Sequence, residues 1–296
     1  MSKIVTIDNG ILKVQISSFG AEMISIQKDG EEKLWCGDEK IWKGHSPILF
    51  PYCSGLRDGV VNMRGKKFTD MIKHGFAKRS EFEVVSEEKT SCCFLLKEND
   101  YTLSMYPYKF NFRVLFKLEK DKVGIYYMVE NTDTVKIPFN VGCHEAYATY
   151  GNIENCYLEF SDDENVIEST CIKNSCLGKE KYKIELEGNK LHLNNNDFIP
   201  IDDFIPETRS NGSIIVENIK SKRVSLYKND EFLASVYFND FTHLVVWTIP
   251  EQEFICIEPW NGLPDLYDSN YNIEDKHSID FVEVGEVKTL YHSITF

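Results

Sequence analysis

The stretch that decides the fold runs from Phe110 to Val129 and reads FNFRVLFKLEKDKVGIYYMV. Apolar residues at 110, 112, 114, 116 and 118 alternate with mostly polar ones, and after Lys120-Asp121-Lys122 the alternation resumes at 123, 125, 127 and 129. Because successive side chains of a strand point to opposite faces, a period of two predicts strands with one buried face. The stretch is therefore predicted to form an antiparallel β-hairpin.

Similar short runs recur along the chain, separated by the Gly, Asn, Asp and Pro clusters that are typical of turns. They lie at residues 11–17, 23–28, 82–87, 91–97, 223–228, 233–238, 244–248, 254–258 and 288–296. No comparable stretch of 12 residues keeps a clean helical period. Strands that follow strands without crossover helices cannot build a parallel sheet. The predicted fold class is all-β, a large antiparallel β-sandwich with helix limited to short turns.

The 296 residues contain no internal repeat and no low-complexity linker. An acidic, Asn-rich stretch from Ser161 to Asp203 is the least regular part and is interpreted as long surface loops between strands. We therefore expect a single domain over residues 1–296, since all-β domains of this length are common.

The charge balance argues against two classes of partner. With 33 Lys+Arg and 47 Asp+Glu, the formal net charge is −14. Binding to nucleic acid or to anionic lipid needs clustered basic residues, so neither partner is expected. No apolar run approaches the ~20 residues of a transmembrane helix. The expected protein is a monomer or homodimer that binds a small molecule.

The nine cysteines are scattered and odd in number, and the N-terminus lacks the apolar segment of a secretion signal. Free thiols in the reducing cytoplasm are therefore expected. No Cys or His pairs have the spacing of zinc ligands, and the zincin-like start at His144-Glu145 has Ala148 where the second His must lie. We expect neither a metal nor a cofactor.

Four segments place titratable side chains in apolar or glycine-rich surroundings. They are Ser46–Pro51 with Ser54–Gly59, Lys73–Lys78, Pro138–Tyr147 and Ile255–Gly262. Glu258 ends an apolar run, so its carboxylate is expected to emerge at a face of the sandwich. Trp260, two residues further on, offers a flat apolar surface of the kind on which sugar rings stack. Any one of these residues alone is more often structural than functional.

Taken together, the polar residues of these segments suit general acid–base chemistry on a carbohydrate. His74 and His144 lie near Gly75 and Gly142, where a missing side chain would let a ligand approach the backbone. Arg57 would supply donors for hydroxyl groups. A histidine titrates near neutrality, and a carboxylate can act as the second proton carrier beside it.

Four motifs, in this order, carry a resemblance to a known family: SPILFP at 46–51, HGFA at 74–77, GCH at 142–144 and IEPW at 257–260. With this order and spacing, the chain resembles the aldose 1-epimerase (galactose mutarotase) family, in particular its LacX-like branch. Residues 33–38, Trp42 and the ending at 286–296 are similar as well. The resemblance therefore covers nearly all of the chain.

The resemblance implies a galactose mutarotase-like β-sandwich that binds a free aldohexose of the galactose or glucose class in an open cleft, without metal or cofactor. Glu258 is similar to the catalytic base of the family and His144 to its general acid. His74 is grouped with these two catalytic residues and would, with Arg57, hold the sugar. Trp260 is expected on the sugar-binding side.

The chain also departs from the family pattern. Asn211 is the nearest counterpart of a substrate-binding Asp, with Asp202 and Asp203 upstream. Glu145 and Tyr147 stand where relatives commonly have Pro and Phe, so a carboxylate close to His144 is expected to favour its imidazolium form.

Two alternatives remain open. One is a hexose-6-phosphate 1-epimerase, for which Lys73, Lys78 and Arg79 near His74 are the available cations. The other is a non-catalytic carbohydrate-binding or sensing protein on the same fold.

Overall fold

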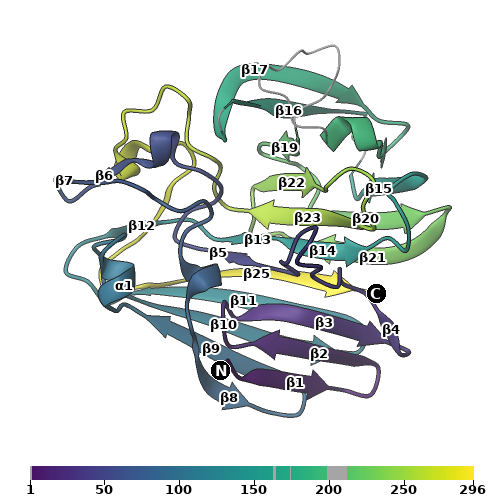
Figure 1. Cartoon of the computed structure of the whole chain (residues 1–296), viewed down its shortest axis with the longest axis horizontal. Coiled ribbons are helices and arrows are strands. Elements are labelled where there is room, and N and C mark those ends of the chain that lie inside the picture. Colours follow the sequence, from purple (N-terminus) through teal and green to yellow (C-terminus); the bar gives the residue numbers. More distant parts are fainter. Residues whose placement is uncertain (1, 163–164, 174, 199–211) are drawn as a thin grey trace.

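A computed structural model describes residues 2–162, 165–173, 175–198 and 212–296, and two large antiparallel sheets dominate it (Figure 1). The nine-stranded sheet has the order β18 (Lys190–His192), β15 (Cys156–Phe160), β20 (Arg223–Lys228), β21 (Glu231–Tyr237), β25 (Val287–Thr295), β11 (Lys122–Asn131), β10 (Phe110–Glu119), β9 (Ser91–Lys97) and β8 (Glu83–Glu87). The eight-stranded sheet has the order β17 (Cys176–Glu185), β16 (Val166–Lys173), β19 (Ile214–Val216), β22 (His243–Trp247), β23 (Phe254–Trp260), β13 (Gly142–Cys143) and β5 (Ile48–Leu49), with β14 (Glu145–Ala148) also paired to β23.

Smaller elements complete the fold. An N-terminal sheet contains β1 (Ile4–Asp8), β2 (Leu12–Ser17), β3 (Glu22–Lys28) and β4 (Glu31–Glu32), and two ribbons pair β6 (Val61–Met63) with β7 (Lys66–Phe68) and β12 (Ile137–Phe139) with β24 (Asp280–Val282). Helix in the described residues is limited to α1 (Asp100–Leu103) and the 3₁₀ turns η1 (Arg57–Gly59), η2 (Ala77–Arg79), η3 (Asn195–Phe198) and η5 (Ile273–Asp275). None of these helices is long and apolar enough to cross a bilayer.

The hairpin predicted from residues 110–129 is confirmed as β10 and β11. Its register runs from Phe110 opposite Asn131 to Glu119 opposite Lys122, and burial alternates along β10 as expected. Lys122 belongs to the second strand rather than to the turn. The strands predicted at 91–97 and 223–228 have the observed bounds of β9 and β20.

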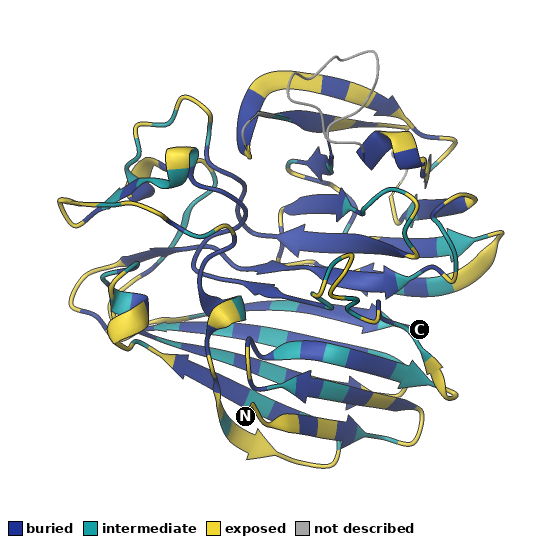
Figure 2. Cartoon of the chain, viewed as in Figure 1, coloured by how far each residue is buried: buried dark blue, intermediate teal, exposed yellow. Residues whose placement is uncertain are grey.

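One apolar cluster fills the space between the sheets. It contains residues from Val5 in β1 to Phe296 at the C-terminus, and both large sheets contribute to it. Figure 2 shows the consequence for exposure, since β23 is buried along its whole length whereas β8 at a sheet edge is mostly exposed. The predicted all-β sandwich is confirmed. The single domain over residues 1–296 stays a prediction.

The interpretation of residues 161–203 as long loops is wrong for much of that stretch. The described residues there form the long strands β16 and β17, which pair from Val166 opposite Glu185 to Lys173 opposite Cys176, and the short strand β18. Five charged side chains of β17 are exposed, namely Lys179, Glu180, Lys181, Lys183 and Glu185. Lys181, Lys183 and Glu185 alternate with the buried Tyr182 and Ile184, whereas Glu180 stands where that alternation would need an apolar residue. The charged run 179–181 therefore interrupts the pattern that would have predicted the full strand.

The alternation of side chains gives the eight-stranded sheet two different faces. Ile255 and Ile257 of β23 pack in the common core, whereas Glu258 and Trp260 line a cavity. In β22, Val246 packs in that core while Trp247 lines the cavity. The outer face of this sheet therefore carries the candidate site.

Candidate active site

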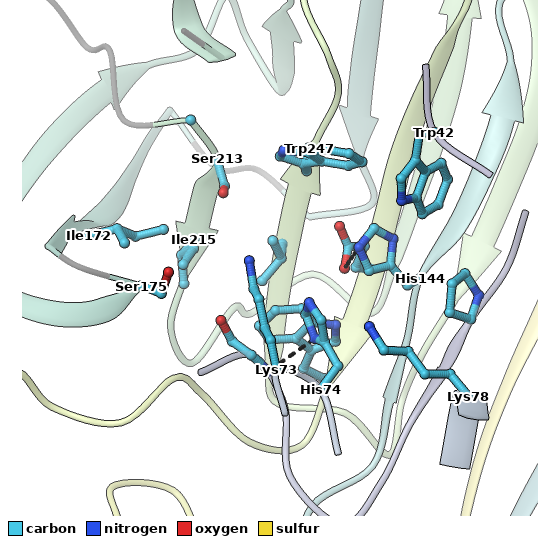
Figure 3. A pocket seen from close by; sticks show the side chains of 16 residues that line it. Trp42, Lys73, His74, Lys78, His144, Ile172, Ser175, Ser213, Ile215 and Trp247 are labelled. Carbon is cyan, nitrogen blue, oxygen red and sulfur yellow. Dashed lines mark hydrogen bonds and ion pairs between the residues drawn. The ribbon is translucent and has the colours of Figure 1, made fainter. Parts of the chain in front are cut away.

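A cavity of about 430 Å³ lies on the outer face of the eight-stranded sheet (Figure 3). Its walls combine three tryptophans, two lysines, two histidines and one glutamate with smaller polar and aliphatic side chains. Such a size and mixed lining are typical of a site for a small molecule.

Glu258 of β23 and His144, between β13 and β14, meet in the wall of the cavity. Glu258 Oε2 lies 3.5 Å from His144 Nε2, and the two residues are 1% and 9% exposed. Within the described residues, neither Glu258 Oε2 nor His144 Nδ1 has a hydrogen-bond partner. Buried polar atoms normally have partners, so these two are available to a ligand.

Burial shifts the pKa values of Glu258 and His144 in opposite directions. It raises the pKa of the Glu258 carboxyl well above its ordinary value, although the Lys73 ammonium opposes this shift. It lowers the pKa of the His144 imidazole, and Lys78 and Lys73 lower it further. Since desolvation disfavours both charges, burial favours one proton on the pair, held as a carboxylic acid beside a neutral imidazole.

His74 lies next to this pair, with its ring centroid 5.6 Å from that of His144. Its backbone has a φ of 69°, and its amide donates to the carbonyl of Ser54 over 2.7 Å. The Ser54 amide donates in turn to His74 Nδ1 over 3.1 Å, which leaves the proton of a neutral ring on Nε2. Burial lowers the pKa of His74 well below its ordinary value. His74 is therefore a neutral donor with a fixed ring.

Tryptophans surround the acid–base pair. Trp42 stacks on His144 at 5.2 Å between ring centroids, and Trp247 meets the same ring edge-on at 5.6 Å. Trp260 lines the cavity, and its Nε1 donates to the Cys143 carbonyl over 3.1 Å. Sequence reasoning singled out Trp260 but missed Trp42 and Trp247 as cavity residues. The alternation within residues 244–248 could have placed Trp247 on the face opposite the core.

Two further predictions meet different outcomes. Arg57 does not line the cavity, since its guanidinium donates to the Ser269 carbonyl over 2.6 Å and stacks on Tyr271 at 4.7 Å. Asn211 lies outside the described residues, as do Asp202 and Asp203. The structure thus brings together Glu258, His144, His74 and Trp260.

The two glycines near the histidines serve internal packing rather than the predicted ligand approach. A Cβ on Gly75, whose φ is 68°, would lie 2.1 Å from the Phe50 carbonyl oxygen. A Cβ on Gly142 would lie 2.6 Å from Trp260 Cδ1. Both glycines therefore let neighbouring parts of the chain approach each other closely.

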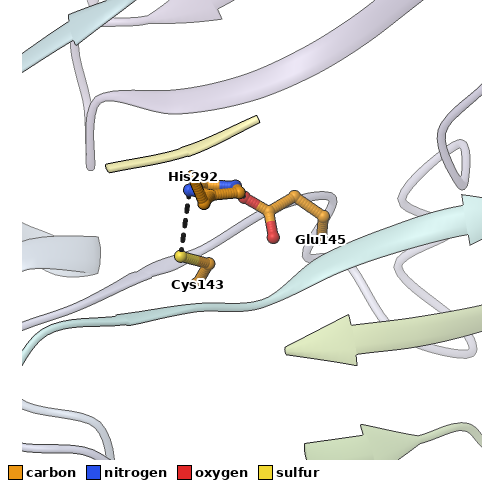
Figure 4. A group of neighbouring side chains, drawn as sticks. All are labelled: Cys143, Glu145 and His292. Atoms are coloured by element: carbon orange, nitrogen blue, oxygen red, sulfur yellow. Dashed lines mark hydrogen bonds and ion pairs between the residues drawn. The ribbon is translucent and has the colours of Figure 1, made fainter. Parts of the chain in front are cut away.

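Glu145 does not lie beside His144 as expected, because adjacent strand residues point to opposite faces. It points into the core, where its Oε1 lies 3.0 Å from Nε2 of His292 in β25 (Figure 4). His292 Nδ1 in turn lies 3.4 Å from Cys143 Sγ. All three side chains are buried. The predicted influence of Glu145 on the His144 imidazolium is therefore wrong.

Sequence spacing also gave no hint of two groups of metal-ligand type. His144, Cys256 and Glu258 have ligand atoms within 4.8 Å of one another, and so do Cys143, Glu145 and His292. In the second group, both nitrogens of His292 already contact neighbours, so a metal would have to displace one of them. In the first group, burial raises the pKa of the Cys256 thiol well above its ordinary value, which disfavours a thiolate ligand.

Comparisons with known proteins place this geometry in context. The model of the aldose 1-epimerase family matches residues 3–270. The plasmid-encoded protein LacX of Lactococcus lactis subsp. lactis is 32% identical over 288 residues, with 93% of each chain covered. The resemblance predicted from the four motifs is thereby confirmed.

Solved structures agree with the fold. A galactose mutarotase related enzyme from Lactobacillus acidophilus is similar with a TM-score of 0.89 and 26% identity, covering 99% of this chain and 97% of that one. A galactose mutarotase-like protein from Lactobacillus casei is similar with a TM-score of 0.87 and 24% identity, covering 99% of each chain.

Proposed function

The chain belongs to the aldose 1-epimerase family, and from this premise we propose that it interconverts the α and β anomers of an aldohexose by general acid–base catalysis. The observation that carries the proposal is the His144–Glu258 pair, which is buried in a cavity wall, 3.5 Å apart and open to a ligand. Anomer exchange needs one group that takes a proton and one that gives a proton at the same time.

The reaction requires the hemiacetal to open and to close on the other face of the carbonyl. We assign Glu258 as the base that takes the proton of the C1 hydroxyl and His144 as the acid that gives a proton to the ring oxygen. The bond between C1 and the ring oxygen then breaks, and an open-chain aldehyde forms. Rotation about the C1–C2 bond and closure return both protons.

This assignment needs the shared proton to lie on His144 when the sugar is bound. The separation of 3.5 Å permits transfer from the carboxyl to the imidazole, and the Lys73 ammonium favours the resulting carboxylate. We propose that His74 donates from Nε2 to a sugar oxygen and that Trp260 or Trp247 packs against the ring. The nine free cysteines suit a reducing compartment, and we place the enzyme in the cytoplasm.

Polarimetry of freshly dissolved α-D-glucose and α-D-galactose tests the proposal. The expected result is faster mutarotation with the wild type, and a return almost to the spontaneous rate with Glu258→Gln. His192→Asn is a matched control, because His192 is an exposed histidine outside the cavity. Dialysis against EDTA is expected to leave the rate unchanged. Sugar binding without any acceleration by the wild type would instead favour the non-catalytic binding protein.

A further inference from the structure

Two lysines, Lys73 and Lys78, line the same cavity. Lys73 and Lys78 lie on either side of His74 (Figure 3), and neither forms an ion pair with any described residue. Glu258 is the one carboxylate among the described residues of the cavity wall, and burial disfavours its charge. The site therefore holds an excess of positive charge in a chain whose net charge is −14.

The surroundings of Lys78 extend this excess. Lys78 also lines an adjoining cavity of about 580 Å³ that shares Trp42 with the first one. Lys43 and Arg79 line that cavity as well, and neither has an ion-pair partner in the described part of the chain. Its carboxylate, Glu22, accepts hydrogen bonds from two backbone amides through Oε1. Lys78 thus lies at a boundary with room for a substituent beyond the sugar ring.

With a neutral sugar bound, the Glu258 carboxylate would be the one counter-charge that the described cavity wall offers to both lysines. Desolvation lowers the pKa of Lys78 to about 8, with Arg79 and Lys73 adding to the shift. This is the direction expected of an ammonium group held in a partly buried site beside like charges. An anion between Lys73 and Lys78 would relieve both effects, and charge-assisted hydrogen bonds are among the strongest in proteins.

We propose that Lys73 and Lys78 form an anion subsite and that the preferred substrate is an acidic aldose, whose ring carries a phosphate or a carboxylate group. This inference rests on the proposed function, since it names the substrate class of the same cavity. The net charge of −14 would repel such a sugar at long range, whereas the local cations would hold it once it enters.

Exchange between the two H1 signals, followed by NMR saturation transfer at anomeric equilibrium, measures the rate for each sugar. The substrates are glucose, galactose, their 6-phosphates, and the corresponding uronates. The wild type is expected to have a kcat/KM roughly 10- to 100-fold higher for an acidic sugar than for the matching neutral one, and the ratio should fall with ionic strength. A preference for the 6-phosphates over the uronates identifies the anion as phosphate, and the reverse identifies a carboxylate.

The double variant Lys73→Gln/Lys78→Gln should bring this ratio close to one. Lys66→Gln/Lys67→Gln removes the same two charges from the exposed β6–β7 ribbon and should keep the wild-type ratio. Equal kcat/KM values of the wild type for acidic and neutral sugars would overturn the anion subsite and leave the proposed function intact. The anion subsite would also be overturned if Lys73→Gln/Lys78→Gln kept the same ratio of kcat/KM values as the surface control Lys66→Gln/Lys67→Gln.

Calorimetric titration with inorganic phosphate tests the subsite without catalysis. Phosphate should bind the wild type and the Lys66→Gln/Lys67→Gln control, and not the cavity variant. If no sugar is turned over but phosphate binding follows this pattern, the proposed function fails while the subsite stands. If the wild type neither binds phosphate nor prefers an acidic sugar of either kind, the subsite is wrong.

Discussion

His144 and Glu145 are adjacent in sequence but point to opposite faces of the segment 142–148, and each pairs with a residue of the opposite kind. The two histidine–glutamate pairs therefore have the same residue types in different surroundings. His144 and Glu258 are 3.5 Å apart in a cavity wall, each with an atom that has no hydrogen-bond partner among the described residues. His292 and Glu145 are 3.0 Å apart in the core, with Cys143 as a third member. Glu145 Oε2 also lacks a hydrogen-bond partner among the described residues. The contrast teaches that access to the cavity, rather than residue type or unsatisfied hydrogen-bonding capacity, distinguishes a candidate active pair from a structural one.

The largest expected effect separates the pairs by activity. Glu258→Gln and His144→Asn should each lower kcat by roughly 10²–10⁴-fold, because each removes a positioned proton carrier. The double variant should be little worse than either single one, since groups that act as a unit are not additive. Stopped-flow polarimetry measures the rates. Near-full activity in both single variants, with sugar still bound, would show that the pair is misassigned.

Removing the Glu145–His292 contact should instead lower the stability of the fold. Glu145→Leu leaves His292 Nε2 in the core without its acceptor, and the loss should be about 1–3 kcal/mol in the free energy of unfolding. Urea unfolding measures this loss, and kcat per folded molecule should stay within about threefold of the wild type. Glu258→Gln is the matched comparison and should change stability less. A kcat that collapses in Glu145→Leu without a loss of stability would place the buried pair in the chemistry.

The pH profile of kcat sharpens the comparison further, because His144 and Glu258 are the groups proposed to exchange protons with the sugar. The active form carries one proton on the pair, so kcat should be bell-shaped and fall roughly tenfold per pH unit on each side. Since the pKa of His144 is lowered and that of Glu258 is raised, the acid limb should lie below the ordinary histidine value and the alkaline limb above the ordinary glutamate value.

The variant Lys78→Gln tests the direction in which that pH profile should shift. The Lys78 ammonium lowers the pKa of both His144 and Glu258, so its removal should move both limbs to higher pH. A profile that does not move with Lys78→Gln would mean that its limbs belong to groups other than His144 and Glu258.

The smallest expected effect concerns Arg57, which the family resemblance assigns to the sugar. Its guanidinium contacts Ser269 and Tyr271 outside the cavity, so Arg57→Ala should change KM by less than about threefold. Initial rates at several sugar concentrations measure KM. A tenfold rise in KM with an unchanged kcat would mean that Arg57 turns toward the sugar in the complex.

The sequence by itself determined the strands and much of the candidate site. The period of two along residues 110–129 is a local signal, and it predicted both strands of the hairpin within about two residues. The same alternation places Glu258 and Trp260, two residues apart, on one face of β23. The equally long strand β17 was not predicted, because three consecutive charged residues at 179–181 interrupt its apolar alternation.

Only the tertiary structure decided which distant residues meet. Glu145 was expected beside His144 because it is adjacent in sequence, yet its partner is His292 in the other sheet. Lys73 and Lys78 flank His74 in the sequence, but only the tertiary structure shows that both line the cavity. The physical reason is that covalent geometry fixes the alternation along one strand, whereas the pairing and register of strands far apart in the chain depend on burying the apolar faces of both sheets together.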